Sequence, residues 1–132
     1  MSANLAFGAG GYRAMDRPVL IDRDYLGELM ADDLGDLAGA LEDAARDDGD
    51  RGFSALDQAV TARDAAAAQA AAHALKGAGG SLGLTRFAAA AEEIMITAGA
   101  GTPPRADEIA HLRALWSDSL DAYRHFFRAG AA

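Results

Sequence analysis

Cysteine is absent from this 132-residue chain, and only three prolines occur in it. The absence of cysteine excludes disulfides, thiolate zinc sites and cysteine nucleophiles, and it fits a reducing compartment. No run of about 18 apolar residues occurs, and the N-terminus lacks the basic start and leucine-rich core of a secretory signal. We therefore expect a soluble cytoplasmic protein that does not insert into a membrane.

Basic residues are also scarce relative to acidic ones, and the formal net charge is −8. No basic cluster interrupts this acidic excess, so sequence-independent binding to nucleic acid phosphates or to anionic lipid is disfavoured. A glycine-rich loop of the kind that cradles nucleotide phosphates is missing as well. The expected partner is therefore another protein, and neither nucleic acid nor ATP.

β-Branched residues are few and alanine is abundant, which favours helix nearly throughout the chain. A chain of this length is one domain in size and can bury about two-thirds of the surface that its unfolded form exposes. Residues 1–18 show little periodicity and contain glycines at positions 8, 10 and 11, so we expect a flexible tail there. We expect one helical domain over residues 19–128 and a short C-terminal tail over residues 129–132.

Four stretches repeat apolar residues every three or four positions, a pattern typical of amphipathic helices. They cover residues 33–62, 65–81 and 84–98, and a last stretch that Thr102 and Pro103 should open as N-cap and first helical residue. A shorter helix over residues 23–30, capped by Asp22, precedes them. Because the connections are short, neighbouring helices should be antiparallel. The expected fold is all-α, an up-down-up-down four-helix bundle with a short extra N-terminal helix.

The run Asp47-Asp48-Gly49-Asp50-Arg51-Gly52 is the weak point of the first long helix. Its local propensity is that of a loop, whereas the apolar phase from Leu41 to Phe53 survives across it. We expect one helix, in which a bend or fraying at this run stays open, with the charges forming a solvated face. Further along, Asp64 should cap the next helix and Gly83 should suit its C-terminal turn.

One stretch combines a reactive side chain with unusually small neighbours: Ala72-His73-Ala74-Leu75-Lys76-Gly77-Ala78-Gly79-Gly80-Ser81-Leu82-Gly83. In a helix each residue advances about 100° around the axis, so His73 stands opposite Leu75 and faces away from the core. The residues within about 60° of His73 are small or polar, namely Ala66, Gln69, Ala70, Lys76, Gly77 and Gly80. Nothing bulky therefore shields the imidazole.

An exposed imidazole is a good nucleophile and can carry a phosphoryl group on a ring nitrogen. Lys76, one turn after His73, would offset the negative charge of that group. Glycine in mid-helix costs up to about 1 kcal/mol relative to alanine, so Gly77 and Gly80 need a reason, such as access for another protein's active site. Gly79 lies on the side of Leu75 and should allow tight helix packing instead.

Two nearby polar residues have open roles. Gln69, one turn before His73, could hydrogen-bond the imidazole or the phosphoryl group, or it could be an ordinary surface residue. Arg86, at the start of the next helix, could supplement Lys76 or could simply be an exposed arginine. The sequence does not choose between these roles.

A metal-dependent enzyme is an alternative from another class, because Glu108 and His111 form the Glu-x-x-His pattern of di-metal four-helix bundles. Such a site uses two copies of the pattern, and the chain has one. Glu92 and Glu93 are adjacent and so point in different directions. We therefore expect no metal site and expect His111 to be a surface histidine, while His125 lacks a motif altogether.

The stretch around His73 resembles the histidine-containing phosphotransfer (HPt) domain family, whose signature His-x-Leu-Lys-Gly is followed shortly by Leu-Gly. The chain has His73-Ala74-Leu75-Lys76-Gly77 and then Leu82-Gly83 at the family's spacing. The similarity continues on both sides and covers residues 19–127. It includes Phe53, Leu56, Val60 and Asp64 upstream, and Phe87 and Glu92-Glu93-Ile94 downstream.

The resemblance implies the same four-helix bundle and a standalone phosphorelay carrier. His73 would accept a phosphoryl group from the aspartyl phosphate of a response-regulator receiver domain and pass it to another receiver. The implied partners are receiver domains and a sensor histidine kinase of the hybrid type, with this chain acting as a monomer. The receiver would supply magnesium, so neither a cofactor nor autonomous enzyme activity is expected here. The alternative is a module of the same shape that docks on a kinase or receiver without carrying phosphate, but the intact His73 and Lys76 favour the carrier.

Overall fold

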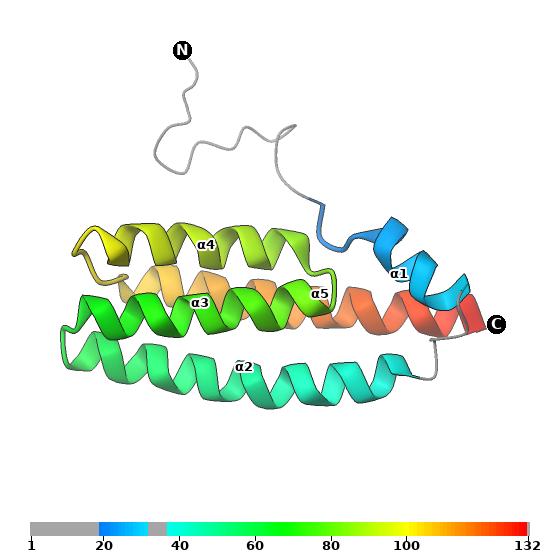
Figure 1. Ribbon diagram of the computed structural model, residues 1–132, viewed down its shortest axis with the longest axis horizontal. Helices are drawn as coiled ribbons and strands as arrows, with labels where there is room; N and C mark the ends of the chain where they lie inside the picture. Colours follow the sequence, from blue (N-terminus) through cyan, green and yellow to red (C-terminus); the bar gives the residue numbers. More distant parts are fainter. Residues whose placement is uncertain (1–18, 32–36, 132) are drawn as a thin grey trace, which may run out of the picture.

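The computed structural model describes residues 19–31 and 37–131, and within them the fold is all-α, as expected, with no strand. Five helices make up this part of the chain: α1 (Arg23–Ala31), α2 (Ala38–Thr61), α3 (Ala65–Ser81), α4 (Thr85–Gly99) and α5 (Ala106–Ala131). The four longer helices lie alongside one another, and α1 lies at one end, close to the C-terminal end of α5 (Figure 1). No helix among the described residues is long and apolar enough to span a membrane.

Tails were expected at both ends of the helical domain, over residues 1–18 and 129–132. The tail expected over residues 1–18 lies outside the described residues. Residues 129–131, which were expected to form part of a short C-terminal tail, continue helix α5 to Ala131. Its last turn carries Arg128, a cation that suits the negative end of the helix dipole.

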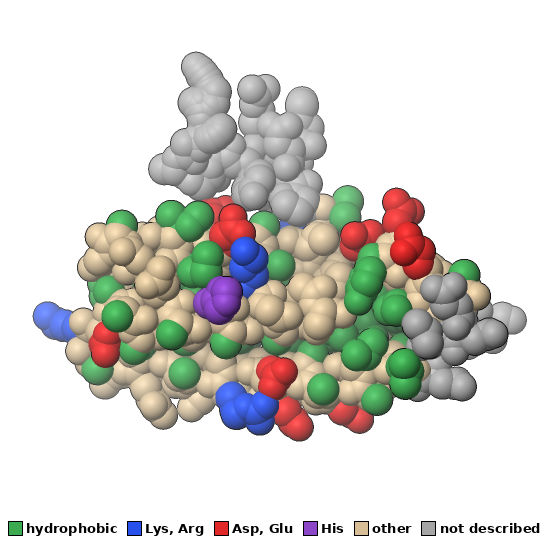
Figure 2. Space-filling view, viewed as in Figure 1, with side chains coloured by type: hydrophobic (Ala, Val, Ile, Leu, Met, Phe, Trp, Pro, Cys, Tyr) green, Lys and Arg blue, Asp and Glu red, His purple; other side chains and the backbone are tan. Residues whose placement is uncertain are grey.

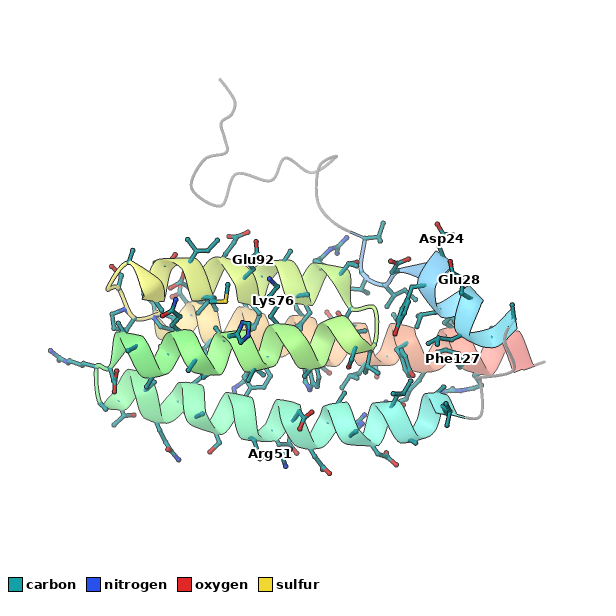
Figure 3. The ribbon with its side chains drawn as sticks, viewed as in Figure 1. Asp24, Glu28, Arg51, Lys76, Glu92 and Phe127 are labelled. Carbon is teal, nitrogen blue, oxygen red and sulfur yellow. The ribbon has the colours of Figure 1, made fainter. Side chains whose placement is uncertain are left out.

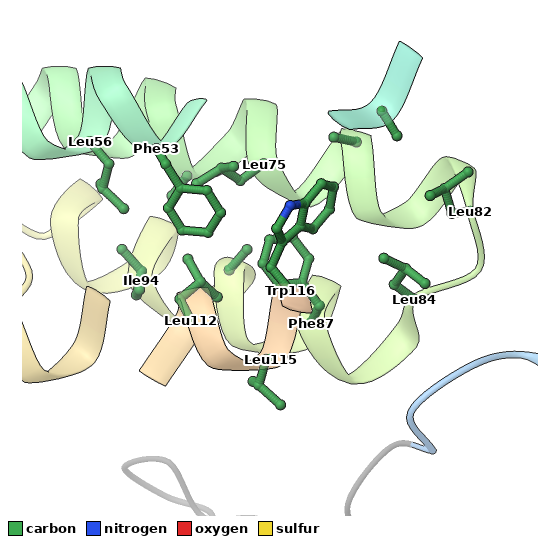
Figure 4. Close-up of a cluster of buried hydrophobic side chains, with 14 of the residues drawn as sticks. Phe53, Leu56, Leu75, Leu82, Leu84, Phe87, Ile94, Leu112, Leu115 and Trp116 are labelled. Atoms are coloured by element: carbon green, nitrogen blue, oxygen red, sulfur yellow. The ribbon is translucent and has the colours of Figure 1, made fainter. Parts of the chain in front are cut away.

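The core is built from apolar side chains of all five helices, and its centre is aromatic (Figure 4). Phe53 of α2, Phe87 of α4 and Trp116 of α5 meet there, with ring centroids 4.8 to 6.4 Å apart. Leu75 adds a fully buried side chain from α3. Burial of each such side chain stabilises the fold by about 1.5 to 3 kcal/mol, so these four residues fix the positions of the four long helices.

Helix α2 is continuous through residues 47–52, which confirms the expectation of one helix despite the poor local propensity. The two glycines of this run are buried where other helices approach. A Cβ atom at Gly49 would lie 2.5 Å from the Trp116 ring, and one at Gly52 would lie 2.6 Å from Cδ2 of Leu75. Both residues therefore lie at packing positions, where tertiary contacts outweigh the helix propensity that glycine lacks.

Helix α3 begins as the sequence predicts, because Asp64 accepts a hydrogen bond from the backbone N–H of Ala67 at 2.9 Å. Gly83 follows its end with a φ of +70°, a conformation that favours glycine. The expected start of α2 at residue 33 lies outside the described residues, as does Leu34. Leu37 occupies the N-cap of α2 without a side-chain cap and is half exposed.

The expected start of the last helix at Thr102-Pro103 is wrong, since α5 begins at Ala106. Pro103 precedes Pro104, and a proline disfavours the α conformation of the residue before it. The backbone N–H of Arg105 instead donates to the carboxylate of Glu108 at 2.8 Å. The helix is thus opened by a glutamate reaching back from its first turn.

Helix α1 docks on the turn between α3 and α4. The predicted cap is confirmed, because Asp22 accepts the backbone N–H of Tyr25 at 3.0 Å. The Tyr25 hydroxyl donates to the carbonyl of Ser81 at 3.1 Å, and the Asp22 N–H donates to the carbonyl of Gly83 at 2.8 Å. Leu26 is fully buried beneath α1. These contacts hold the turn at the C-terminal end of α3.

Polar contacts join α5 to α2. The buried Tyr123 hydroxyl donates to the carbonyl of Ala38 at 2.8 Å, and burial together with the nearby Glu42 raises the pKa of Tyr123 to about 12. Glu42 accepts hydrogen bonds from Arg46 of its own helix and from Arg124 of α5, at 2.8 and 2.7 Å. The last long helix is thereby fastened to the first.

Candidate functional site

His73 lies on the exposed face of α3, as its helical position predicts. Its neighbour Ala72 and the nearby Leu75 are both fully buried, so α3 turns one face to the core and the other to solvent. Figure 2 shows a histidine side chain at the surface over α3, next to a basic and an acidic side chain. An imidazole in this position is open to a protein partner.

The side of the histidine that faces α4 is polar. The Lys76 Nζ atom lies 2.6 Å from Oε1 of Glu92, an ion pair that links α3 to α4 across 16 residues of sequence (Figure 3). The two side chains are 38% and 46% exposed, so water screens the pair and its contribution to stability is about 1 kcal/mol or less. Its main effect is to hold the ammonium group on the α4 side of His73.

Gln69 extends the same polar side toward the end of α4. A Cβ atom at Gly99 would lie 2.6 Å from Nε2 of Gln69, so the amide rests against the backbone of that glycine. The side chain is exposed, and this contact with Gly99 does not choose between the two roles that the sequence left open for Gln69. Arg86, the other residue with an open role, is half-buried in the first turn of α4.

The opposite side of the histidine, toward α2, is lined mainly by small residues. A groove of about 680 Å³ runs between α2 and α3. Helix α3 contributes Ala70, Ala74 and Gly77 to it, and α2 contributes Gly52 and Ala55. The charged residues Asp48 and Arg51 of α2 line the groove as well. His73 therefore lies on α3 between a polar side that contacts α4 and a groove toward α2 that is lined mainly by small residues.

The glycines of α3 fall into two groups. A Cβ atom at Gly79 would lie 2.5 Å from Cδ2 of Phe87, so Gly79 allows the close packing of α4 that its helical position predicts. A Cβ atom at Gly77 or Gly80 would meet nothing within 4 Å apart from its own residue, its chain neighbours and the adjacent backbone of its own helix. Both are exposed, as are Ala66 and Ala70. The space around the imidazole is open on the side where a partner would approach.

The remaining histidines lie elsewhere. His111 and His125 are exposed on α5. Loss of hydration and the nearby Glu108 raise the pKa of Glu93, while His111 lowers it, which places these three groups near one another between α4 and α5. Within residues 19–31 and 37–131, no group of three or more His, Cys, Asp or Glu side chains could hold a metal ion.

The sequence did not predict that Glu92 would pair with Lys76. The two residues belong to different helices, and no local spacing rule relates positions so far apart. The only sequence signal was that Glu92 belongs to a helix expected to be the antiparallel neighbour of α3. Glu92 therefore adds a negative charge beside Lys76, the one cation that the sequence predicted for the site.

Chemically, the site offers an accessible imidazole nucleophile, a nearby ammonium group and open space for a second protein. The sequence model of the Hpt domain family matches residues 46–125, which is more than half of the chain and includes His73 and Lys76. Comparisons with curated proteins and with solved structures found no match.

Proposed function

Because the chain belongs to the Hpt domain family, whose members are phosphotransfer modules of phosphorelays, we propose that it carries a phosphoryl group on His73. Domains of this family interact with receiver domains and histidine kinases and are carriers rather than enzymes. The observation that supports the assignment to His73 is its exposed position, with Lys76 one turn away and open space at Gly77 and Gly80. His111 and His125 are exposed too, but they lie on α5, outside the motif that contains Lys76 and Gly77.

In the proposed step, the lone pair of a neutral ring nitrogen of His73 attacks the phosphorus of an aspartyl phosphate on a receiver domain. The N–P bond forms while the P–O bond breaks, and the aspartate leaves as a carboxylate with the electron pair. The proton on the other ring nitrogen stays there or passes to water. Attack by a second receiver's aspartate reverses these changes and regenerates the free imidazole.

Lys76 would assist by offsetting the negative charge of the phosphoryl group as it moves. The receiver would supply magnesium and the acidic pocket that holds it, so the proposal requires no cofactor in this chain. We further propose that α2 to α5 form an antiparallel up-down-up-down bundle and that the protein acts as a monomer. The contacts of α2 with α3, α3 with α4, α4 with α5, and α5 with α2 support that arrangement.

The proposal is tested by incubating the protein with a panel of phosphorylated receivers and mapping the label that it takes up. We expect one phosphohistidine, labile in acid and stable in alkali, at residue 73. Folded His73→Gln should take no label, whereas His111→Gln and His125→Gln should be labelled like the parent. Labelling of His73→Gln, or its loss in either control variant with the fold intact, would contradict the assignment.

The second candidate is an interaction module that docks without carrying phosphate, and the same experiment distinguishes it. Such a module would bind receivers, with equal affinity in the parent and in His73→Gln, yet neither would be labelled by any member of the panel. The exposed His73 and the nearby Lys76 favour the carrier, because a docking surface alone needs neither an accessible nucleophile nor a cation beside it.

A further inference from the structure

The cation of the candidate site is already engaged before any phosphoryl group arrives. Lys76 Nζ lies 2.6 Å from Oε1 of Glu92, and Lys76 follows His73 by one turn of the same helix. Figure 3 shows the two side chains meeting between α3 and α4. A phosphoryl group on His73 would therefore share this lysine with a carboxylate.

We propose that Glu92 is a positioning residue that limits how strongly Lys76 holds the phosphoryl group, and so keeps phosphorylated His73 a good donor. The inference rests on the proposed function, since it concerns the phosphorylated form of His73. It assigns a role on the partner helix that the motif around His73 does not contain. Glu92 acts through Lys76 and does not itself react.

The physical reason lies in charge. A phosphoryl group carries close to two negative charges, and a cation beside it lowers the free energy of the phosphorylated state. A carrier must release the group as readily as it accepts it, so a cation that binds it too firmly would trap it. A carboxylate paired with the cation opposes this by competing for the ammonium group.

The geometry also explains why the competition is modest. Lys76 and Glu92 are 38% and 46% exposed, so water can replace either partner when the ammonium group moves. Lys76 can therefore leave Glu92 for a phosphoryl group, while Glu92 stays close enough to compete for the ammonium group. Removing the charge of Glu92 should shift the transfer equilibrium toward phosphorylated His73 by roughly twofold to fivefold, the range that an exposed ion pair supports.

Glu93 provides a matched control. It is the next residue on α4, about 100° further around the helix, and its electrostatic neighbours are Glu108 and His111 of α5. Glu93→Gln removes the same unit of charge from the protein as Glu92→Gln. A general effect of net charge would therefore be equal in the two variants, whereas competition for Lys76 would appear in Glu92→Gln alone.

The experiment measures the equilibrium constant for transfer between one phosphorylated receiver and the full chain, together with the lifetime of the phosphohistidine. Glu92→Gln should favour the phosphorylated chain and slow onward transfer, and Glu93→Gln should match the parent. When Lys76 is replaced by alanine, the effect of Glu92→Gln should fall to that of Glu93→Gln, because the cation for which Glu92 competes is gone. Glu92→Asp, which keeps the charge, should restore most of the parent equilibrium.

Equal constants for Glu92→Gln and Glu93→Gln, with the parent labelled on His73, would overturn this inference and leave the proposed function standing. An undiminished Glu92→Gln effect in the Lys76→Ala protein would overturn it as well, since Glu92 would then act independently of Lys76. A parent that takes no label on His73 from any receiver would overturn both proposals. Melting temperatures of all variants confirm that each equilibrium refers to folded protein.

Discussion

The two faces of α3 use the same small residues for opposite purposes. On the inner face, Gly79 is small because the Phe87 ring would lie 2.5 Å from any Cβ atom there. On the outer face, a Cβ atom at Gly77 would meet nothing within 4 Å beyond its chain neighbours and the backbone of its own helix. The reason for a glycine in a helix therefore depends on what occupies the space that a side chain would fill. On one face that is another helix, and on the other it is space that a partner could occupy.

The largest effect is expected on the inner face. Gly79→Leu should destabilise the protein by about 3 kcal/mol, because leucine would overpack the contact with Phe87 and force α3 and α4 apart. Urea unfolding of the variant beside Gly80→Leu measures the difference between the faces. Gly80 is adjacent in sequence and open to solvent, so its variant controls for the change in helix propensity. Equal stabilities for the two variants would contradict the assignment of Gly79 to packing and of Gly80 to the open face.

The next effect concerns function on the outer face. Gly77→Leu should leave the fold as stable as the parent or firmer by up to about 1 kcal/mol, since leucine has the better helix propensity. The side chain would nevertheless project into the approach to His73, and the rate of transfer from a receiver should fall by roughly tenfold or more. Thermal melting measured beside the transfer rate separates the two properties. A lowered melting temperature with normal transfer would assign Gly77 to packing instead.

A smaller effect is expected for Lys76→Ala on the polar side of the same face. Transfer should slow by a few-fold without being abolished, because a half-exposed cation offers electrostatic help that water partly screens. The difference from the parent should shrink at high salt. Transfer rates measured at low and high ionic strength decide the matter, and a rate equal to the parent's under both conditions would make Lys76 an ordinary surface residue.

The smallest effect is expected at Glu93, the neighbour of Glu92 on α4. Folding raises the pKa of Glu93, so the protonated form is favoured in the folded state, and this contribution is lost as the pH rises through the folded-state pKa. Glu93→Gln should therefore be slightly more stable than the parent at pH 7. The gain should disappear below the unfolded-state pKa of about 4.3, where both forms are neutral. Urea unfolding at pH 7 and pH 3 tests this, and a gain that is the same at both pH values would contradict the assigned cause.

Local patterns predicted much of the fold. The bounds of α3, its Asp64 cap, the glycine turn at Gly83 and the exposed position of His73 all follow from spacing and from the chemistry of single residues. The prediction for the start of α5 failed because the helix-opening signal at Thr102-Pro103 was read without the restriction that Pro104 places on Pro103. That error was also local, and it could have been avoided from the sequence.

The sequence by itself determined the helices of residues 37–131, their order, and an exposed imidazole with a cation one turn away, because these depend on residues within a few positions of one another. Only the tertiary structure decided that Gly49 and Gly52 are packed, and which side chain Gly79 meets, since these contacts come from other helices. It also paired Lys76 with Glu92 across two helices. Contacts between residues far apart in sequence depend on how the helices pack, and helical periodicity indicates which face is buried without indicating which atom will meet it.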